Sequence, residues 1–305
     1  MVNITPVTYI PTIVNDNAHE EEIWSVAWSK KANVIVSGSL DASVKCWDAS
    51  TGEFKYELKE HALGVMSVDT HGSRAVTASL DAIIAIWDLE NNGTLVKKIV
   101  GDPGQTWSAR FSPDGESIAT GSHSGNIHIY NIETGEKTAT FTAKGFIMSI
   151  AYSPDGQFLA AGADDGGIYV YNTETGQLAH TFSDHTMAVR TLTFASDNRT
   201  LISGCDDKCI HVYDVEHGQL ASILTGHSSW ILTVAANPNI SKQQLASGSA
   251  DGKVKIWDLG MRSVIETHEG DEGEVWDVAW NSEGTKLVSV SSDKTIRWYA
   301  SSGSS

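Results

Sequence analysis

A repeat of roughly forty residues runs through this chain and constrains its fold more than any other feature. The first copy reads VSGSLDASVKCWD over residues 36–48, and steps of 40, 43, 41, 42, 44 and 42 residues separate the aromatic near the end of successive copies. These aromatics are Trp47, Trp87, Tyr130, Tyr171, Tyr213, Trp257 and Tyr299. A single unit of this size cannot bury its own apolar faces, and this period with a Trp-Asp ending is typical of four-stranded blades arranged radially. Seven copies therefore predict one closed all-β ring, a seven-bladed β-propeller.

The two ends of the chain predict how the ring closes. The last copy stops at Tyr299, where its third strand is expected to end, and the Ser/Gly-rich residues 300–305 cannot form a fourth. The β-prone run 8–14 precedes the first full repeat, so we expect it to be the outer strand of blade seven, which leaves no open edge. The expected organisation is a tail at 1–7, the propeller at 8–300 and a flexible tail at 301–305. In blade six, the long connection 237–244 is expected to be a surface loop.

Composition and charge argue against several classes of function. Asp and Glu number 38 against 21 Lys and Arg, a formal charge of −17. Such a field repels phosphate backbones and anionic lipid headgroups, so neither direct nucleic-acid binding nor membrane binding is expected. The chain has no basic start followed by an apolar run and no stretch near the roughly 18 apolar residues of a membrane span, which favours an intracellular protein. Cys46, Cys205 and Cys209 are too few for a disulfide framework and lack a second pair at zinc-ligand spacing, so no metal and no cofactor is expected.

Four repeats share a set of polar residues that can form a chain of hydrogen bonds. Each has a His ahead of the first strand, a Ser or Thr in the second, an Asp at the following turn and an aromatic in the third. The Asp can accept a hydrogen bond from one nitrogen of the imidazole, and the other ring nitrogen can accept one from the hydroxyl. The hydroxyl oxygen can in turn accept a hydrogen bond from the aromatic side chain. The sets are His19, Ser37, Asp41 and Trp47 in blade one; His61, Thr77, Asp81 and Trp87 in blade two; His185, Ser203, Asp207 and Tyr213 in blade five; and His227, Ser247, Asp251 and Trp257 in blade six.

A Ser, a His and an Asp grouped in this way could also form a hydrolase triad. Hydrolytic catalysis needs one exposed nucleophile beside an oxyanion hole, whereas four copies of one set at repeat spacing indicate a structural role. The protein is therefore not expected to be an enzyme.

The repeat and its polar sets resemble the WD-repeat (WD40) β-propeller family over essentially residues 8–300, with blades three, four and seven departing from the polar pattern. In that family the narrow face exposes the residues around the start of the first strand and the residue before the turn Asp. The residues at these positions are Trp24, Leu40, Met66, Leu80, Trp107, Phe146, Met148, Arg190, Trp230, Leu232 and Trp276. They include anchor types that are enriched at protein interfaces, within an acidic rim that includes Glu22, Asp164, Asp206 and Glu274. We expect a partner site that takes one or two apolar anchors and an acidic group for Arg190, whereas the overall acidity of the chain would instead favour basic flanks on the partner. The alternative is that these side chains only plug the channel.

Four segments narrow the resemblance within the family. Residues 23–28, 78–82, 149–156 and 226–232 look like the animal WD-repeat subunits of the superkiller complex, a branch shared with the RNA-polymerase-II-associated factor complex. The resemblance implies a non-catalytic adaptor of nucleus and cytoplasm. It would bind a tetratricopeptide scaffold and help a helicase supply RNA to the exosome for mRNA decay, and it would accompany transcription elongation and histone modification. The propeller alone is expected to be monomeric.

Two other functions remain as alternatives. Substrate receptors of ubiquitin ligases resemble one another in a Trp-Asp-any-Arg ending, and this chain reads WDAS, WDLE and WDLG at 47–50, 87–90 and 257–260. The missing arginine argues against that class of adaptor. A propeller enzyme that uses carboxylates or a metal in the channel is the other alternative, but the repeated Asp residues have structural partners in the expected hydrogen-bond chains.

Overall fold

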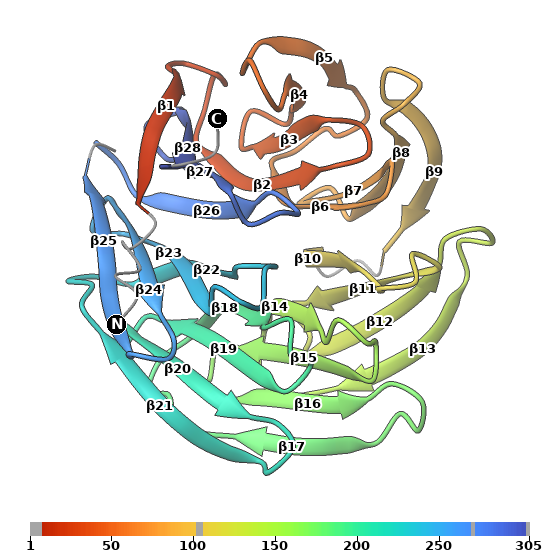
Figure 1. The fold of residues 1–305 in the computed structure, drawn as a ribbon. Coiled ribbons are helices and arrows are strands. Elements are labelled where there is room, and N and C mark those ends of the chain that lie inside the picture. The colour runs from red at the N-terminus through yellow and green to blue at the C-terminus, as the bar shows by residue number, and fades with distance from the viewer. Residues whose placement is uncertain (1–7, 102–105, 270–271, 303–305) are drawn as a thin grey trace.

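The computed structural model describes residues 8–101, 106–269 and 272–302. All regular elements in these residues are β-strands, which form seven four-stranded antiparallel sheets arranged in a ring around a common centre (Figure 1). The predicted all-β, seven-bladed propeller is therefore confirmed. Nowhere in the described ranges is there a helix long and apolar enough to cross a membrane.

In the first six blades the chain runs from the innermost strand to the outermost. Blade one contains β2 (Ile23–Ser29), β3 (Val34–Ser39), β4 (Val44–Asp48) and β5 (Phe54–Leu58). Blade two contains β6 (Val65–His71), β7 (Arg74–Ser79), β8 (Ile83–Asp88) and β9 (Thr94–Val100). Blade three contains β10 (Thr106–Phe111), β11 (Ser117–Ser122), β12 (Asn126–Asn131) and β13 (Lys137–Thr142).

The next three blades repeat this order, and the last one differs. Blade four contains β14 (Ile147–Tyr152), β15 (Phe158–Ala163), β16 (Ile168–Asn172) and β17 (Leu178–Phe182). Blade five contains β18 (Val189–Phe194), β19 (Thr200–Cys205), β20 (Cys209–Asp214) and β21 (Gln219–Thr225). Blade six contains β22 (Ile231–Ala236), β23 (Gln244–Ser249), β24 (Lys253–Asp258) and β25 (Ser263–Glu269). Blade seven contains β26 (Val275–Trp280), β27 (Lys286–Ser291), β28 (Ile296–Ser301) and β1 (Tyr9–Asn15).

The N-terminal strand closes the ring, as the sequence predicts. β1 pairs antiparallel with β28, from Tyr9 opposite Ser301 to Asn15 opposite Ile296. β28 continues past Tyr299 to Ser301, which is buried, so the expected flexible tail does not begin at residue 301. The expected tails at 1–7 and 303–305 lie outside the described residues.

The connection 237–244 in blade six is a surface loop, as expected, with Pro238, Ile240, Ser241 and Gln243 exposed, but it is anchored at both ends. Asn237 and Gln244 are buried at its two ends. The hydroxyl of Tyr9 lies 2.9 Å from Gln244 Oε1 and 3.0 Å from the carbonyl of Gly284 in blade seven, and Lys242 Nζ donates to the same carbonyl at 2.7 Å. The connection is held in place because its polar side chains meet the closing strand and the neighbouring blade.

The core lies between the blades. The described residues contain seven apolar clusters, one at each interface of neighbouring blades. The contact is close enough to require glycine in the second strand of blade one, since a Cβ on Gly38 would lie 2.7 Å from Val65 Cγ1 of blade two. Each blade thus buries its faces only against its neighbours, which is why stability requires the whole ring.

Candidate functional site

The second residue of every innermost strand points toward the mouth of the central channel. In each strand the pairing register shifts between the first and third residues, so the second is the extra residue of a β-bulge. Bulges re-aim a side chain away from the ordinary alternation of a strand. The seven bulge residues all line one cavity of about 80 Å³, and they are Trp24, Met66, Trp107, Met148, Arg190, Leu232 and Trp276. The structure therefore brings these sequence-predicted residues together.

Aromatic side chains form a continuous arc along part of this mouth. Trp24 stacks on Trp276 with ring centroids 4.8 Å apart and an interplanar angle of 21°, and its centroid lies 5.9 Å from that of Trp107. Trp107 meets Phe146 edge to face at 5.1 Å, and His123 lies 4.9 Å beyond Phe146. Such ring pairs hold each other in fixed orientations, so the arc is a preformed apolar surface.

Three of the predicted contact residues lie too deep to serve as partner contacts. Met66, Met148 and Leu232 are 7%, 9% and 6% exposed. They pack beneath the larger side chains and form the floor of the mouth, which is the plugging role that was the alternative. The remaining apolar residues are half-buried, except that Trp230 is 43% exposed; the half-buried ones are Trp24, Leu40, Leu80, Trp107, Phe146 and Trp276.

Arg190 is already paired, contrary to the expectation that a partner would supply its acidic group. Its Nε and Nη2 donate to Asp206 Oδ1 and Oδ2 at 2.5 and 2.9 Å, and the guanidinium lies 5.1 Å from the ring centroid of Trp230. Asp206 is buried in this pair and is not an open part of an acidic rim. Because both oxygens of Asp206 accept hydrogen bonds from Arg190, the guanidinium is held in place against Trp230. Arg190 therefore does not need a carboxylate from a partner protein.

Two exposed apolar residues of this face were not among the sequence-predicted contacts. Leu63 and Met187 lie in the loops that lead into β6 and β18, two residues ahead of each strand. Each of the two is a large apolar residue in a polar loop, which is the feature by which the sequence could have identified it. Phe146 and Trp230 lie one residue before their strands, whereas Leu63 and Met187 lie two residues before theirs.

Below the aromatic arc, the third residues of the innermost strands link neighbouring blades. The hydroxyls of Ser25, Ser67 and Thr191 accept hydrogen bonds from backbone N–H groups of the next blade at 3.0 to 3.1 Å. Asp277 takes this position in blade seven, and its Oδ2 accepts from the N–H of Val26 in blade one at 3.0 Å. Burial raises the pKa of the Asp277 carboxyl above its usual value. This layer fixes the geometry of the mouth, and sequence analysis did not single it out because its residues are small and ordinary.

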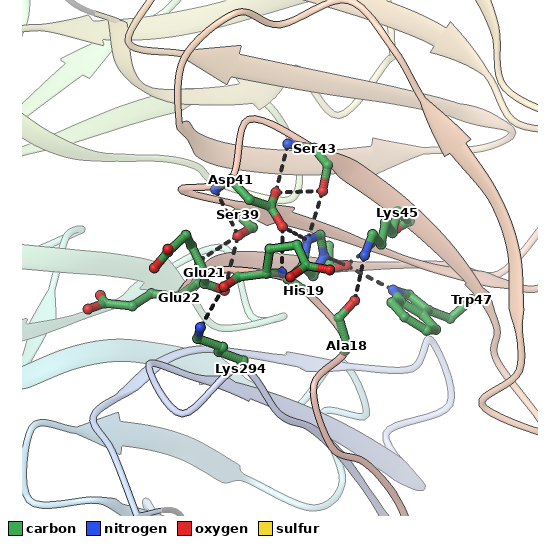
Figure 2. Close-up of polar contacts among 12 residues, drawn as sticks. Ala18, His19, Glu21, Glu22, Ser39, Asp41, Ser43, Lys45, Trp47 and Lys294 are labelled. Atoms are coloured by element: carbon green, nitrogen blue, oxygen red, sulfur yellow. Dashed lines mark hydrogen bonds and ion pairs between the residues drawn. The ribbon is translucent and has the colours of Figure 1, made fainter.

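In blade one, the predicted polar set forms one chain of hydrogen bonds, of which Figure 2 labels His19, Asp41 and Trp47. Trp47 Nε1 donates to Ser37 Oγ at 2.8 Å, Ser37 Oγ lies 2.8 Å from His19 Nε2, and His19 Nδ1 lies 3.1 Å from Asp41 Oδ2. These partners place the imidazole proton on Nδ1, so that Nε2 can accept from the serine. The chain ties the loop ahead of β2 to the turn between β3 and β4.

The sets in blades two and six have the same order, and blade five has its Ser, His and Asp linked in that order. The distances from aromatic to hydroxyl, hydroxyl to imidazole and imidazole to carboxylate are 3.0, 2.7 and 3.3 Å in blade two and 2.8, 2.8 and 2.9 Å in blade six. In blade five, the imidazole of His185 lies 2.7 Å from both Ser203 and Asp207, whereas the hydroxyl of Tyr213 lies 3.1 Å from Nδ1 of His211. The four hydroxyl residues are fully buried, and their oxygens already have partners within the sets. A substrate cannot reach them as nucleophiles.

Two groups of potential metal ligands occur in the described residues. His185, Cys205 and Asp207 form one, and Asp214, Glu216 and His217 the other. In the first group, both ring nitrogens of His185 already have partners. In the second, Arg199 forms salt bridges to Asp214 and Glu216. Both groups are thus occupied by interactions within the protein.

Burial lowers the pKa of the four structural histidines below the ordinary value, and their Asp partners offset this effect only in part. His211 stacks on His185 at 3.7 Å, and burial, followed by the charge of His185, lowers its pKa to about 4. The unfolded chain therefore binds more protons than the folded one between pH ~6.5 and the lowered pKa values, so acid favours unfolding.

We expect the free energy of unfolding to fall as pH is lowered from 7 to 5, by up to about 1.4 kcal/mol per pH unit for each such histidine. Urea unfolding at pH 7, 6 and 5 measures this slope. His211→Gln should reduce the slope. A stability that is flat over this range contradicts the assignment of neutral buried imidazoles.

Comparison with known proteins matches this repeat architecture. The model of the family described as WD domain, G-beta repeat, matches residues 11–48, 52–88, 93–131, 135–172, 176–214, 218–258 and 262–299. The WD repeat-containing protein SL1-17 of Schistosoma mansoni is 38% identical over 152 residues, which cover 47% of this chain and 50% of that protein. The WD repeat-containing protein VIP3 of Arabidopsis thaliana is 31% identical over 200 residues, which cover 59% of this chain and 62% of that protein. The nuclear distribution protein PAC1 of Arthroderma otae is 30% identical over 148 residues, which cover 44% of this chain and 32% of that protein. The matched part of the chain thus spans about half to three fifths of the first two relatives.

Proposed function

The chain belongs to the WD-repeat family, and from that premise we propose that it is a non-catalytic adaptor whose channel mouth binds a segment of a partner protein. The observation that carries this proposal is the aromatic arc of Trp276, Trp24, Trp107 and Phe146, which is preformed and only half-buried. Interfaces draw most of their binding energy from a few aromatic anchors. The arc supplies that surface on a rigid ring.

The pairing of Arg190 with Asp206 limits which kinds of partner segment the channel mouth can bind. With that cation neutralised, the face offers apolar contact and half-buried leucines, Leu40 and Leu80, at the turns of blades one and two. Carboxylates at the edge, such as Glu22, which accepts a hydrogen bond from Trp24 Nε1 at 3.0 Å, add negative potential. We therefore expect a segment with one or two apolar anchors and basic rather than acidic flanks.

We further propose that the chain is a WD-repeat subunit of a superkiller-type complex. The support is the resemblance of residues 23–28, 78–82, 149–156 and 226–232 to that branch of the family. In this role it holds a tetratricopeptide scaffold and thereby a helicase for mRNA decay by the exosome in the cytoplasm. It also accompanies the RNA-polymerase-II-associated factor complex in the nucleus during transcription elongation and histone modification.

The test is a pull-down with tagged protein, followed by mass spectrometry and a binding titration with the purified scaffold. Trp24→Glu/Trp107→Glu is expected to weaken scaffold binding at least tenfold, since it places two charges in the apolar arc. Phe54→Glu, which changes an exposed aromatic on the outer strand of blade one, is the matched control and should bind as wild type.

The outcomes separate the two levels of the proposal. Capture of a tetratricopeptide scaffold with an RNA helicase by wild type, and its loss in the folded double variant, supports both the subunit role and the channel mouth. Capture of ubiquitin-ligase components instead contradicts the subunit role. Full binding by the folded double variant removes the aromatic arc from the site.

A further inference from the structure

A second groove lies at the interface of blades five and six, at the opposite ends of the innermost strands from the aromatic arc. It has a volume of about 300 Å³ and is formed by the turn after β18, the connection 237–244 and the turn between β24 and β25. Its apolar lining includes Val212, Ala221, Ala236, Ile240 and Leu259. Because these turns lie on the other face of the ring, a segment bound here does not compete with one at the channel mouth.

The groove has a local cause in the sequence. The sixth residue of the innermost strand is aromatic in five blades, namely Trp28, Phe111, Tyr152, Phe194 and Trp280. In blade six this residue is Ala236, so the space beside β22 is unfilled. The long connection that follows forms a wall with Ile240, which is 58% exposed. Ser196 Oγ of blade five donates to the carbonyl of Pro238 at 2.9 Å, which fixes that wall across the interface.

The charges at the groove are of two kinds. Arg262, which lies at its edge, is exposed, and its guanidinium has no hydrogen bond or ion pair with any residue in the described ranges. Asp197, on the other side of the groove, already has hydrogen-bond partners. Its carboxylate accepts hydrogen bonds from the N–H groups of Arg199 and Thr200 at 2.9 and 2.8 Å and from Thr200 Oγ1 at 2.7 Å. The unpaired group at the groove is thus an arginine, whose planar fork of donors fits a carboxylate.

We propose that this groove binds a short segment of a second partner protein in which an aliphatic side chain adjoins an aspartate or glutamate. The aliphatic side chain fills the space beside Ala236 and contacts Ile240, and the carboxylate pairs with Arg262. The net negative charge of the protein opposes a strongly acidic partner at long range, but it is screened beyond about 8 Å at physiological salt, so a single carboxylate in contact with Arg262 is favoured. With the channel mouth on the opposite face, the propeller can then connect two proteins at once.

Fluorescein-labelled octapeptide pools test this site on the full chain by fluorescence polarisation. Each pool has Leu, Ile or Met at the centre, followed by Glu, Ser or Lys. The Glu pool is expected to bind about tenfold more tightly than the Lys pool. Arg262→Glu should reverse that order, and Ala236→Trp, which introduces an aromatic found at this position in blades one and seven, should weaken every pool at least tenfold.

Matched variants keep the test specific. Lys208→Glu changes an exposed lysine at the turn between β19 and β20, on the other face, and should not alter peptide binding. Thr70→Trp adds the same side chain at the corresponding position of β6 and controls for its effect on folding. Trp24→Glu/Trp107→Glu should also leave peptide binding intact, so failure of this proposal is distinguishable from failure of the channel-mouth site.

Three results would overturn the proposal. The first is that no pool binds with a dissociation constant below millimolar. The second is that binding is unchanged in Arg262→Glu, a surface change that keeps the test valid if Ala236→Trp fails to fold. The third is a concentration-dependent dimer in sedimentation that Ala236→Trp abolishes, since the occupant of the groove would then be a second copy of the chain.

Discussion

Deletion of residues 1–15 is expected to abolish the cooperative unfolding of the whole ring. β1 is the only source of an outer strand for blade seven among the described residues, and six of its residues pair with β28. Tyr9 is also lost, and with it the buried contacts to Gln244 and Gly284 that join blades six and seven. At about 1 kcal/mol per hydrogen bond, the loss is on the order of 5 kcal/mol, comparable with the total stability of a typical domain.

Urea unfolding followed by tryptophan fluorescence measures this effect. A synthetic peptide of residues 8–16 should restore part of the stability, because it can pair with the open edge of β28. Ile10→Ser, at an exposed position of β1, is the control and should shift stability by no more than about 0.5 kcal/mol. A truncated protein that unfolds as cooperatively as wild type would show that β1 does not close the ring in solution.

Asp277→Leu is expected to lower the free energy of unfolding by about 3 kcal/mol. The carboxylate accepts four hydrogen bonds that join three blades: from Ser25 Oγ and the N–H of Val26 at 3.0 Å, from Thr233 Oγ1 at 2.8 Å, and from its neighbour Val278 N–H at 2.9 Å. Leucine is similar in size but accepts none of them. The hydroxyls can turn to other acceptors, whereas the backbone N–H groups cannot, so most of the cost comes from those two donors.

Asp277→Asn separates hydrogen bonding from charge. The amide keeps one acceptor oxygen, so the free energy of unfolding of Asp277→Asn should fall by about half as much as that of Asp277→Leu. Chemical denaturation at pH 7 compares the variants, and Asp155→Asn at an exposed turn of blade four serves as the surface control. Equal stability of Asp277→Leu and wild type would mean that this residue does not hold blades six, seven and one together.

The hydrogen-bond order within the polar sets could be predicted from the repeat pattern alone. The order of partners from Trp47 through Ser37 and His19 to Asp41 follows from donor and acceptor types at fixed positions in the repeat. This inference works because all four residues belong to one blade. Their distances in space are therefore set by strand pairing and by the turn at Asp41, both of which are local.

The channel mouth was predicted less completely. Sequence placed one residue per blade at the mouth, but it did not separate Met66, Met148 and Leu232, which form the floor, from the tryptophans above them. It also assigned Arg190 to a partner, whereas the side chain pairs with Asp206. Side-chain depth depends on the sizes of neighbours in other blades, and those neighbours are about forty residues away in the chain.

The sequence by itself determined the seven-bladed ring, its closure by residues near the N-terminus and the polar sets within blades. Each of these rests on periodicity, on the alternation of strands or on turn chemistry, which act over a few residues and repeat. Only the tertiary structure decided which channel residues are exposed, that Asp277 joins three blades, and that Ala236 with the connection 237–244 leaves a groove beside Arg262. These features arise where side chains of different blades meet, because packing between blades depends on the particular volumes and charges in contact and not on the repeat they share.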